Sequence, residues 1–453
     1  MLQPMSEVLN RWHILASQDT NRHPANVNDV VEDSHWQQYV GRFKTFEKLV
    51  QPEPQVPLSM IICIPSYAEP DLITTLESLS SCQDPGIPFE VLVLFNEDDR
   101  MTEEESALHR QSFERCREWV NERSHLNFSI HPIWFAKMEG VKWGVGWARK
   151  MLMDEAARRL KPGGIIVNLD ADCTVSKNYL ERVWQKFETD QTFDAASIYV
   201  EHPFAHLSRE QKEAIIEYEL HLRYLIHAKR WSGHPFAFQT FGSAMAVRRK
   251  AYLEQGGMNT RQAGEDFYFL QKFIELGKLK EIRDVIVYPS PRKSLRVPFG
   301  TGKAIYQVNE ENLEWKTTAF EVFQALRPLF QQIKDLHLIM NSQHQADFRA
   351  TLYEKLNLSK ELISFLESID FISKCDSISL HTSNYAAFER RFYRFFNAFM
   401  LIRCMHYMRD RFIPDVSVTS AVEKLVEANK WVHPVQRDAE HYLEFFRMMD
   451  KKV

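Results

Sequence analysis

The sequence has few glycines, 15 in 453 residues, and none of them builds a phosphate-binding loop. The first apolar run leads into IPSYAEP, so the GxGxxG spacing of a dinucleotide-binding domain is absent there, and the P-loop pattern GxxxxGK[ST] does not occur. The six cysteines form no CxxC pair and show no zinc-ligand spacing, which favours reduced, structural thiols. These absences argue against a dinucleotide-binding domain, a P-loop and a cysteine-bound zinc site.

Long hydrophobic runs are also missing. No stretch approaches eighteen uninterrupted apolar residues, and the first residues lack the basic start and long apolar centre of a signal peptide. The formal net charge of −5 gives no reason to expect a nucleic-acid partner. We therefore expect a cytoplasmic globular protein, with peripheral contact to the inner face of a membrane left open.

Short apolar runs alternate with helical patterns over some 240 residues. Their apolar character is nearly continuous, which is typical of strands covered on both faces. The predicted strands are 60–64, 90–95, 128–134, 165–169, 195–200 and 285–288. Strand and helix in alternation predict the α/β class, with a mostly parallel sheet flanked by helices.

Capping patterns mark where several helices begin and end. Thr102 with Glu105, and Ser208 with Gln211, form capping boxes ahead of two amphipathic stretches. The segment Pro162-Gly163-Gly164 is predicted to separate a helix at 147–160 from the strand at 165.

The chain is predicted to have three parts. Residues 1–57 form a polar, helical extension that closes on the proline-rich QPEPQVP. Residues 58–310 hold the α/β domain. Strand signals disappear after about residue 311, so 311–453 is predicted to be a helical C-terminal region.

Three predicted strands end in polar stretches: IPSYAEPD, FNEDDR and NLDADC. In an open α/β sheet, ligands bind at the carboxyl ends of the strands. Each stretch alone is also explained by the chemistry of turns, where Asp and Asn are common. Together they favour one ligand site.

The order of these blocks carries a family resemblance. IPSYAEP, an acidic strand end, GWARK, DAD and GED follow one another as in the family-2 glycosyltransferases of the GT-A fold, which the chain resembles over about residues 58–305. The resemblance implies a nucleotide-diphosphate sugar as donor, a hydroxyl acceptor on a glycan, a lipid-linked sugar or a small molecule, and Mg²⁺ or Mn²⁺ as cofactor.

The resemblance also implies roles for individual residues. Asp172 of the DxD motif would bind the metal, and Asp170 would approach the metal or the ribose. The residues implied to bind the nucleotide sugar are Pro65, Tyr67, Glu69, Asp98, Asp99, Arg149 and Asp170. For Arg149, an exposed helix cation is an equally good interpretation.

In this family the Asp of the ED pair is the base that deprotonates the acceptor, which here is Asp266, preceded by Glu265. The two residues open a predicted helix, so acidic residues at a helix N-terminus are the alternative. The resemblance favours Asp266 as the catalytic base.

The family often supplies a histidine after the ED pair as a metal ligand, and none occurs here between Asp266 and His337. The chain offers Arg292 and Arg296 instead, whose guanidinium groups suit phosphate oxygens. Surface arginines on a loop are the alternative. The third metal ligand is therefore left open.

Other stretches fit less well with a site. His202 and His206 have helical ligand spacing, but Pro203 between them argues against zinc. The basic and aromatic stretch ERRFYRFFNAFMLIR either packs its aromatic face inward or lies on a membrane. Two other functions remain: a non-catalytic scaffold that binds nucleotide sugars, and a sugar nucleotidyltransferase, which IPSYAEP disfavours because it lacks a glycine-rich basic loop.

Overall fold

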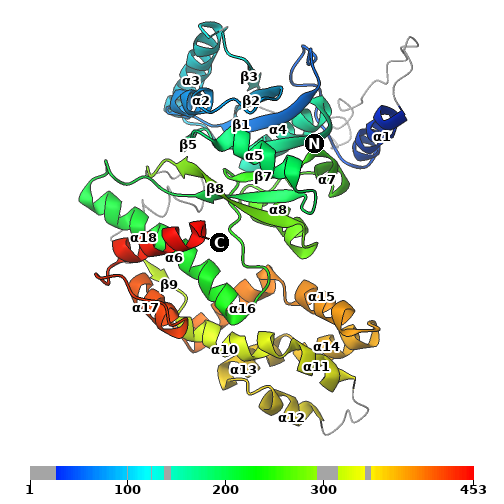
Figure 1. Cartoon of the computed structure of the whole chain (residues 1–453), viewed down its shortest axis with the longest axis vertical. Coiled ribbons are helices and arrows are strands. Elements are labelled where there is room, and N and C mark those ends of the chain that lie inside the picture. The colour runs from blue at the N-terminus through cyan, green and yellow to red at the C-terminus, as the bar shows by residue number, and fades with distance from the viewer. Residues whose placement is uncertain are drawn as a thin grey trace, which may run out of the picture. The chain divides into compact units, whose positions relative to one another are not determined.

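A computed structural model describes residues 27–98, 100–123, 125–136, 144–292, 315–341 and 348–452 (Figure 1). The chain forms two compact units. The first, here the sheet unit, consists of Met1–Val200 and Thr240–Ser290; the second, the helical unit, consists of Glu201–Gln239 and Pro291–Val453. Residues 201–239 therefore pack with the helical unit, although strands of the sheet unit precede and follow them. The predicted boundaries at 57 and 310 remain predictions.

The sheet unit is built on one eight-stranded sheet in the order β3-β2-β1-β4-β7-β6-β8-β5. Its strands are β1 (Leu58–Ser66), β2 (Phe89–Asn96), β3 (Ser129–Phe135), β4 (Leu160–Asn168), β5 (Cys173–Val175), β6 (Ala195–Val200), β7 (Met245–Arg248) and β8 (Leu279–Pro289). Neighbouring pairs are parallel except at β7, which runs antiparallel to β4 and β6, and at β5, which runs antiparallel to β8.

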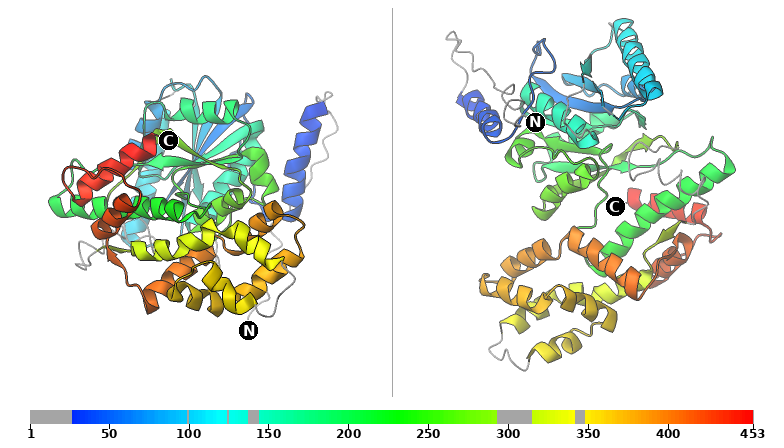
Figure 2. Two further views of the ribbon diagram at one scale, coloured as in Figure 1. Left: turned by 60° about the horizontal axis from the view of Figure 1, so that its bottom comes forward. Right: turned by 180° about the vertical axis from the view of Figure 1, so that it is seen from behind.

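Successive residues of the central strands point to opposite faces of the sheet, and both faces are buried. Ile62 and Ile64 of β1 belong to one hydrophobic cluster, whereas Ile61 and Cys63 belong to another. Helices α2 (Leu72–Ser80), α3 (Glu103–Asn121) and α5 (Tyr179–Thr189) contribute to the first cluster. Helices α1 (Val27–Arg42), α4 (Val145–Arg159), α7 (Arg249–Glu254) and α8 (Glu265–Glu275) contribute to the second, so the sheet lies between two helical layers (Figure 2).

The predicted class, a mostly parallel sheet flanked by helices with a helical C-terminal region, is confirmed. All six predicted strands are present, and both capping boxes form, at the starts of α3 and α6 (Arg209–Ser232). The interpretation of Pro162-Gly163-Gly164 as a separator is wrong. Helix α4 ends at Arg159 and β4 begins at the next residue, so the Pro-Gly-Gly segment lies inside β4, where the pairing of β1 with β4 shifts its register.

The helical unit surrounds α6 and a core rich in phenylalanine and leucine. Its other elements are β9 (Lys316–Thr317), α10 (Phe320–Gln331), α11 (Ile333–Met340), α12 (Phe348–Lys355), α13 (Lys360–Ser368), α14 (Phe371–Leu380), α15 (Tyr385–Phe395), α16 (Ala398–Arg411), β10 (Val416–Ser417), α17 (Val418–Ala428) and α18 (Ala439–Lys451). On α15, Phe388 and, within the ERRFYRFF stretch, Phe392 are buried in this core. In the described part of the chain, no helix has the length and hydropathy needed to cross a bilayer.

A buried charge cluster joins α6 to α18. The carboxylate of Glu219 accepts hydrogen bonds from Arg223, from Arg447 and from the backbone N–H of His202. Arg223 also pairs with Asp450. Burial would raise the pKa of Glu219, but the surrounding cations and hydrogen bonds outweigh it and hold the pKa well below its usual value.

Candidate active site

The DAD motif forms a tight, anchored turn directly after β4. The N–H of Leu169 donates to the carbonyl of Cys63 on β1 at 3.1 Å, and the hydroxyl of Thr75 donates to the carbonyl of Ala171 at 2.8 Å. Ala171 is buried, while Asp170 and Asp172 on either side of it are partly exposed. The fixed turn therefore presents both carboxylates at the carboxyl end of the sheet, where ligands bind in this class of fold.

Arg149, near the N-terminus of α4, is 3% exposed. One terminal nitrogen, Nη2, lies 2.5 Å from Oδ1 of Asp170, and the other, Nη1, pairs with Oε1 of Glu265. The prediction of an exposed helix cation is therefore wrong. Arg149 instead joins the DAD turn to the start of α8.

Glu265 and Asp266 open α8 after Gly264, whose φ of +72° lies in the left-handed region that favours glycine. Glu265 is 1% exposed and points toward Arg149. Asp266 is partly exposed, and its two oxygens accept the N–H groups of Gly242 and Phe267, each at 2.7 Å. The two neighbours thus have different environments: Glu265 is enclosed, and Asp266 reaches the surface.

The carboxylates of Asp170, Glu265 and Asp266 lie around one guanidinium in this site. Burial, together with the neighbouring Asp266 and Asp170, raises the pKa of Glu265 to about 7, although Arg149 opposes the shift. Burial also raises the pKa of Asp266, against the effect of Arg149 and of the two backbone donors. A carboxylate with a raised pKa is a better proton acceptor near neutral pH.

The loop after β1 holds the predicted nucleoside-binding residues Pro65, Tyr67 and Glu69. Pro65 and Tyr67 are partly exposed, and Glu69 is buried, with Oε1 accepting the N–H of Asp71 at 3.0 Å. The hydroxyl of Ser112 on α3 donates to the carbonyl of Glu69 at 2.7 Å. The loop is therefore fastened to α3.

Asp98, after β2, is buried and tied to Arg100. Its Oδ1 accepts both the backbone N–H and the Nε–H of Arg100, each at 2.9 Å. Burial would raise the pKa of Asp98, but the bonds from Arg100 outweigh it and keep the pKa below its usual value. Asp99 lies outside the described residues, so its predicted role remains a prediction.

Of the two predicted phosphate-binding arginines, Arg292 belongs to the helical unit and Arg296 lies outside the described residues, so their role remains a prediction. His202, considered above for zinc, is buried, and its Nδ1 lies 3.0 Å from Oε2 of Glu219.

Asp170 and Asp172 are the residues that would hold a divalent cation. Across the described ranges, no group of three or more His, Cys, Asp or Glu side chains is gathered as a metal site. Two carboxylates still suit Mg²⁺ or Mn²⁺, because such ions are commonly held by one or two carboxylates together with water and substrate phosphates. Asp170 pairs with Arg149 through Oδ1 alone, and its side chain is 36% exposed. The two carboxylates of the DAD motif therefore fit a cation that phosphate oxygens of a substrate also bind.

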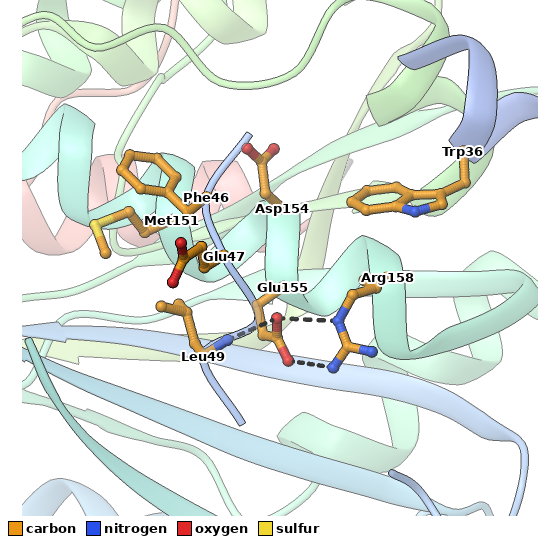
Figure 3. A pocket seen from close by; sticks show the side chains of 8 residues that line it. All are labelled: Trp36, Phe46, Glu47, Leu49, Met151, Asp154, Glu155 and Arg158. Atoms are coloured by element: carbon orange, nitrogen blue, oxygen red, sulfur yellow. Dashed lines mark hydrogen bonds and ion pairs between the residues drawn. The ribbon is translucent and has the colours of Figure 1, made fainter. Parts of the chain in front are cut away.

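A small cavity lies elsewhere in the sheet unit, between α4 and the segment that follows α1 (Figure 3). It is lined by Trp36, Phe46, Glu47, Leu49, Met151, Asp154, Glu155 and Arg158. Its volume of about 10 Å³ is enough for one water molecule. None of the predicted site residues lines it, so this cavity is not the candidate active site.

Two contributors to the site had no signal in the sequence. Gly242 lies in the stretch FGSA just before β7, and His109 lies in the middle of α3 with no motif around it. The side chain of His109 accepts the N–H of Ala68 at 3.1 Å. Gly242 acts through its backbone N–H, which donates to the side chain of Asp266, whereas the side chain of His109 acts on the backbone of Ala68. Both contacts join residues remote in sequence, which no local pattern reveals.

A family model described as glycosyl transferase family 2 matches residues 61–256. The match covers under half of the chain and confirms the resemblance found in the sequence: residues 61–256 are similar to the glycosyltransferases of family 2. No curated protein matches the chain.

Among solved structures, similarity is found to TarS from S. aureus, with 14% identity, a TM-score of 0.37, and coverage of 70% of this chain and 53% of that one. TarS 1-349 in complex with UDP-GlcNAc shows 14% identity, a TM-score of 0.36, and coverage of 87% and 90%. Mannosyltransferase PcManGT from Pyrobaculum calidifontis in complex with GDP-Man and Mn²⁺ shows 14% identity, a TM-score of 0.34, and coverage of 88% and 96%. The chain spans about half the length of the first of these proteins. Because the scores are low, the fold rests on the strand order itself.

Proposed function

We propose that the sheet unit transfers a sugar from a nucleotide-diphosphate sugar to a hydroxyl group of an acceptor, with inversion at the anomeric carbon. The observation that carries this proposal is the meeting of Asp170, Glu265 and Asp266 around Arg149 at the carboxyl end of the sheet. This arrangement supports Asp170 as a carboxylate that binds the donor and Asp266 as a base beside it.

In the proposed reaction the acceptor oxygen attacks the anomeric carbon as the bond from that carbon to the diphosphate oxygen breaks. The electron pair of that bond leaves with the nucleoside diphosphate, and the acceptor proton passes to Asp266. Two backbone N–H groups orient the carboxylate of Asp266, while its raised pKa suits it to accept the proton. A divalent cation, when bound by Asp172 and Asp170, would supply positive charge to the leaving diphosphate.

The residues proposed to meet the nucleoside are Pro65, Tyr67, Glu69 and Asp98, with Asp99 retained as a prediction. Arg292 and Arg296 are retained as predicted ligands of the diphosphate. The acceptor is a glycan, a lipid-linked sugar or a small molecule. Peripheral contact with a membrane and a cytoplasmic location also remain predictions.

Calorimetry with UDP and with GDP, each with and without Mn²⁺, tests the proposal. We expect one nucleotide to bind, and to bind more tightly with Mn²⁺. A panel of sugar nucleotides, scored by thermal stabilisation and by hydrolysis, then identifies the donor, because bound ligand raises the melting temperature by mass action. Absence of binding to every nucleotide would contradict the proposal.

The non-catalytic scaffold is distinguished in the same assays. A scaffold binds a sugar nucleotide but neither hydrolyses it nor transfers its sugar to any acceptor. The nucleotidyltransferase is distinguished by binding a nucleoside triphosphate in preference to the diphosphate.

A further inference from the structure

We propose that Arg149 is a positioning residue, which fixes the DAD turn and the acidic pair Glu265–Asp266 in one arrangement and does not itself bind the nucleotide. This inference deepens the proposed function and rests on it. It replaces the role beside the nucleotide that the family resemblance implied for this arginine.

The guanidinium of Arg149 is enclosed and used on two sides. Its two terminal nitrogens pair with Asp170 and with Glu265, which lies 116 residues away in sequence. Asp170 lies in the turn after β4 and Glu265 is the first residue of α8, so both carboxylates lie at the ends of regular elements. A planar fork with two occupied terminal nitrogens fixes the distance between its two partners, which a single ammonium group cannot do.

Gly242 extends this arrangement to the proposed base. A Cβ atom built on Gly242 would overlap the guanidinium of Arg149, so only glycine allows the backbone to lie against it. The N–H of Gly242 donates to Oδ2 of Asp266 at 2.7 Å. Arg149 therefore sets the position of Gly242 by packing, and Gly242 in turn orients Asp266.

As a consequence, the positions of Asp170, proposed to bind the donor, and of Asp266, the proposed base, both depend on the side chain of Arg149. Displacement of the guanidinium would shift Asp170 of the DAD turn and release Asp266 from its backbone donor together. Misplacement of reacting groups by about 1 Å can lower a rate about 100-fold. We therefore expect changes at Arg149 to lower kcat more than donor affinity.

Arg149→Met is the first test, with Arg159→Met as its matched control. Arg159 lies on the same helix, and its side chain is equally buried and forms a two-pronged pair with Glu90, with bonds of 2.8 and 3.0 Å. We expect both variants to lose thermal stability, because each leaves a buried carboxylate without its arginine. Only Arg149→Met should lose kcat, by about 100-fold. Retention of kcat within about twofold in a folded Arg149→Met protein would overturn the proposal.

Two further variants keep the test decisive if Arg149→Met does not fold. Arg149→Lys keeps the positive charge but not the two terminal nitrogens of the guanidinium. Gly242→Ala keeps Arg149 but adds a methyl group that displaces its guanidinium. Both are expected to lower kcat by a larger factor than the affinity for UDP or GDP. If Arg149→Lys instead raises the KM for the donor and leaves kcat unchanged, Arg149 binds the nucleotide and the positioning role is wrong.

A double-mutant cycle on thermal unfolding tests the link without any activity. Asp170→Asn and Glu265→Gln are made singly and together, in the Arg149 protein and in Arg149→Lys. We expect their effects on stability to be non-additive with Arg149 and additive with lysine. Additivity in both proteins would contradict the link. The cycle remains informative even if no sugar nucleotide binds, so failure of the proposed function is distinguishable from failure of this inference.

Discussion

The backbone N–H of Ala68 donates to Nδ1 of His109 across 3.1 Å, and Ala68 is held at a φ of +46°, in the left-handed region. The ring of His109 is surrounded by Tyr67, Phe95 and Trp134 at centroid distances of 5.1–6.1 Å. Burial lowers the pKa of His109 to about 4, so the ring is neutral near pH 7 and Nδ1 is free of a proton. A histidine on α3 thus stabilises an unusual backbone conformation in the loop proposed to meet the nucleoside.

His109→Phe is predicted to raise the KM for the donor about tenfold while leaving kcat within about twofold, because binding is weakened equally in the ground and transition states. Phenylalanine fills the aromatic surroundings but cannot accept the N–H of Ala68. Steady-state kinetics with the donor identified by the panel measure both constants. An unchanged KM would show that the loop keeps its conformation without this hydrogen bond.

Asp266→Asn is predicted to lower kcat by about 100- to 10,000-fold, the usual contribution of a general base. The amide keeps the shape of the side chain but cannot take the acceptor proton, so calorimetry should show unchanged binding of UDP or GDP. Asp284→Asn is the control, because Asp284 is a partly exposed carboxylate of the same unit that pairs with Lys186 and Arg182. Full activity of Asp266→Asn would remove this residue from the role of base.

Asp172→Ala is predicted to abolish the Mn²⁺-dependent part of nucleotide affinity and to leave the metal-independent part. The physical reason is that the cation connects the DAD carboxylates to the diphosphate. Titrations with UDP or GDP in Mn²⁺ and in EDTA separate the two parts. If Mn²⁺ strengthens binding equally in the variant and in the unchanged protein, Asp172 is not the metal ligand.

Glu219→Gln is predicted to destabilise the protein by about 3 to 5 kcal/mol at pH 7, since it leaves buried arginines without their carboxylate. The pKa of Glu219 is depressed in the folded state, so its stabilising contribution is present above the unfolded pKa of about 4.3 and is lost as the pH falls toward the folded value. The difference in melting temperature between the two proteins should therefore shrink below about pH 4.

The control for Glu219 is Glu213→Gln on the same helix. Glu213 forms an exposed pair with Arg209, and solvent screening makes the contribution of such a pair to stability small. A constant difference between Glu219→Gln and the unchanged protein from pH 7 to pH 3 would contradict the ionised state assigned to Glu219.

The strands were predictable where burial on both faces gives a continuous apolar run, as in β1. Strand β7 was missed because Met245–Arg248 is short and follows the glycine-bearing FGSA, which resembles a loop. It becomes a strand because β4 and β6 pair with it on either side, a tertiary effect. The Pro-Gly-Gly segment was wrongly predicted to separate a helix from a strand for the same reason. Pairing with β1 holds it in β4 despite its turn-like composition.

Several residues of the candidate site could be named from the sequence, but their arrangement could not be predicted, and their roles remain predictions. Asp170 and Asp172 stand out because they end an apolar strand, and Asp266 because it opens a helix. The pairing of Arg149 with Glu265 could not be predicted, because 116 residues separate them. Each residue could also be explained locally, Arg149 as an exposed helix cation and Glu265 as an acidic residue at a helix N-terminus. The insertion of residues 201–239 into the helical unit likewise depends on contacts with segments after residue 291.

The cluster at Glu219 has a consequence for synthesis of the chain. Its arginine partner Arg447 lies 228 residues further along, so the ribosome must add that many residues before the pair can close. During this interval the α6 carboxylate has Arg223 as its nearest cation, and the apolar faces of α6 have no α18 to cover them. A nascent chain of intermediate length therefore exposes apolar surface, and pauses in translation between α6 and α18 should increase aggregation of this protein.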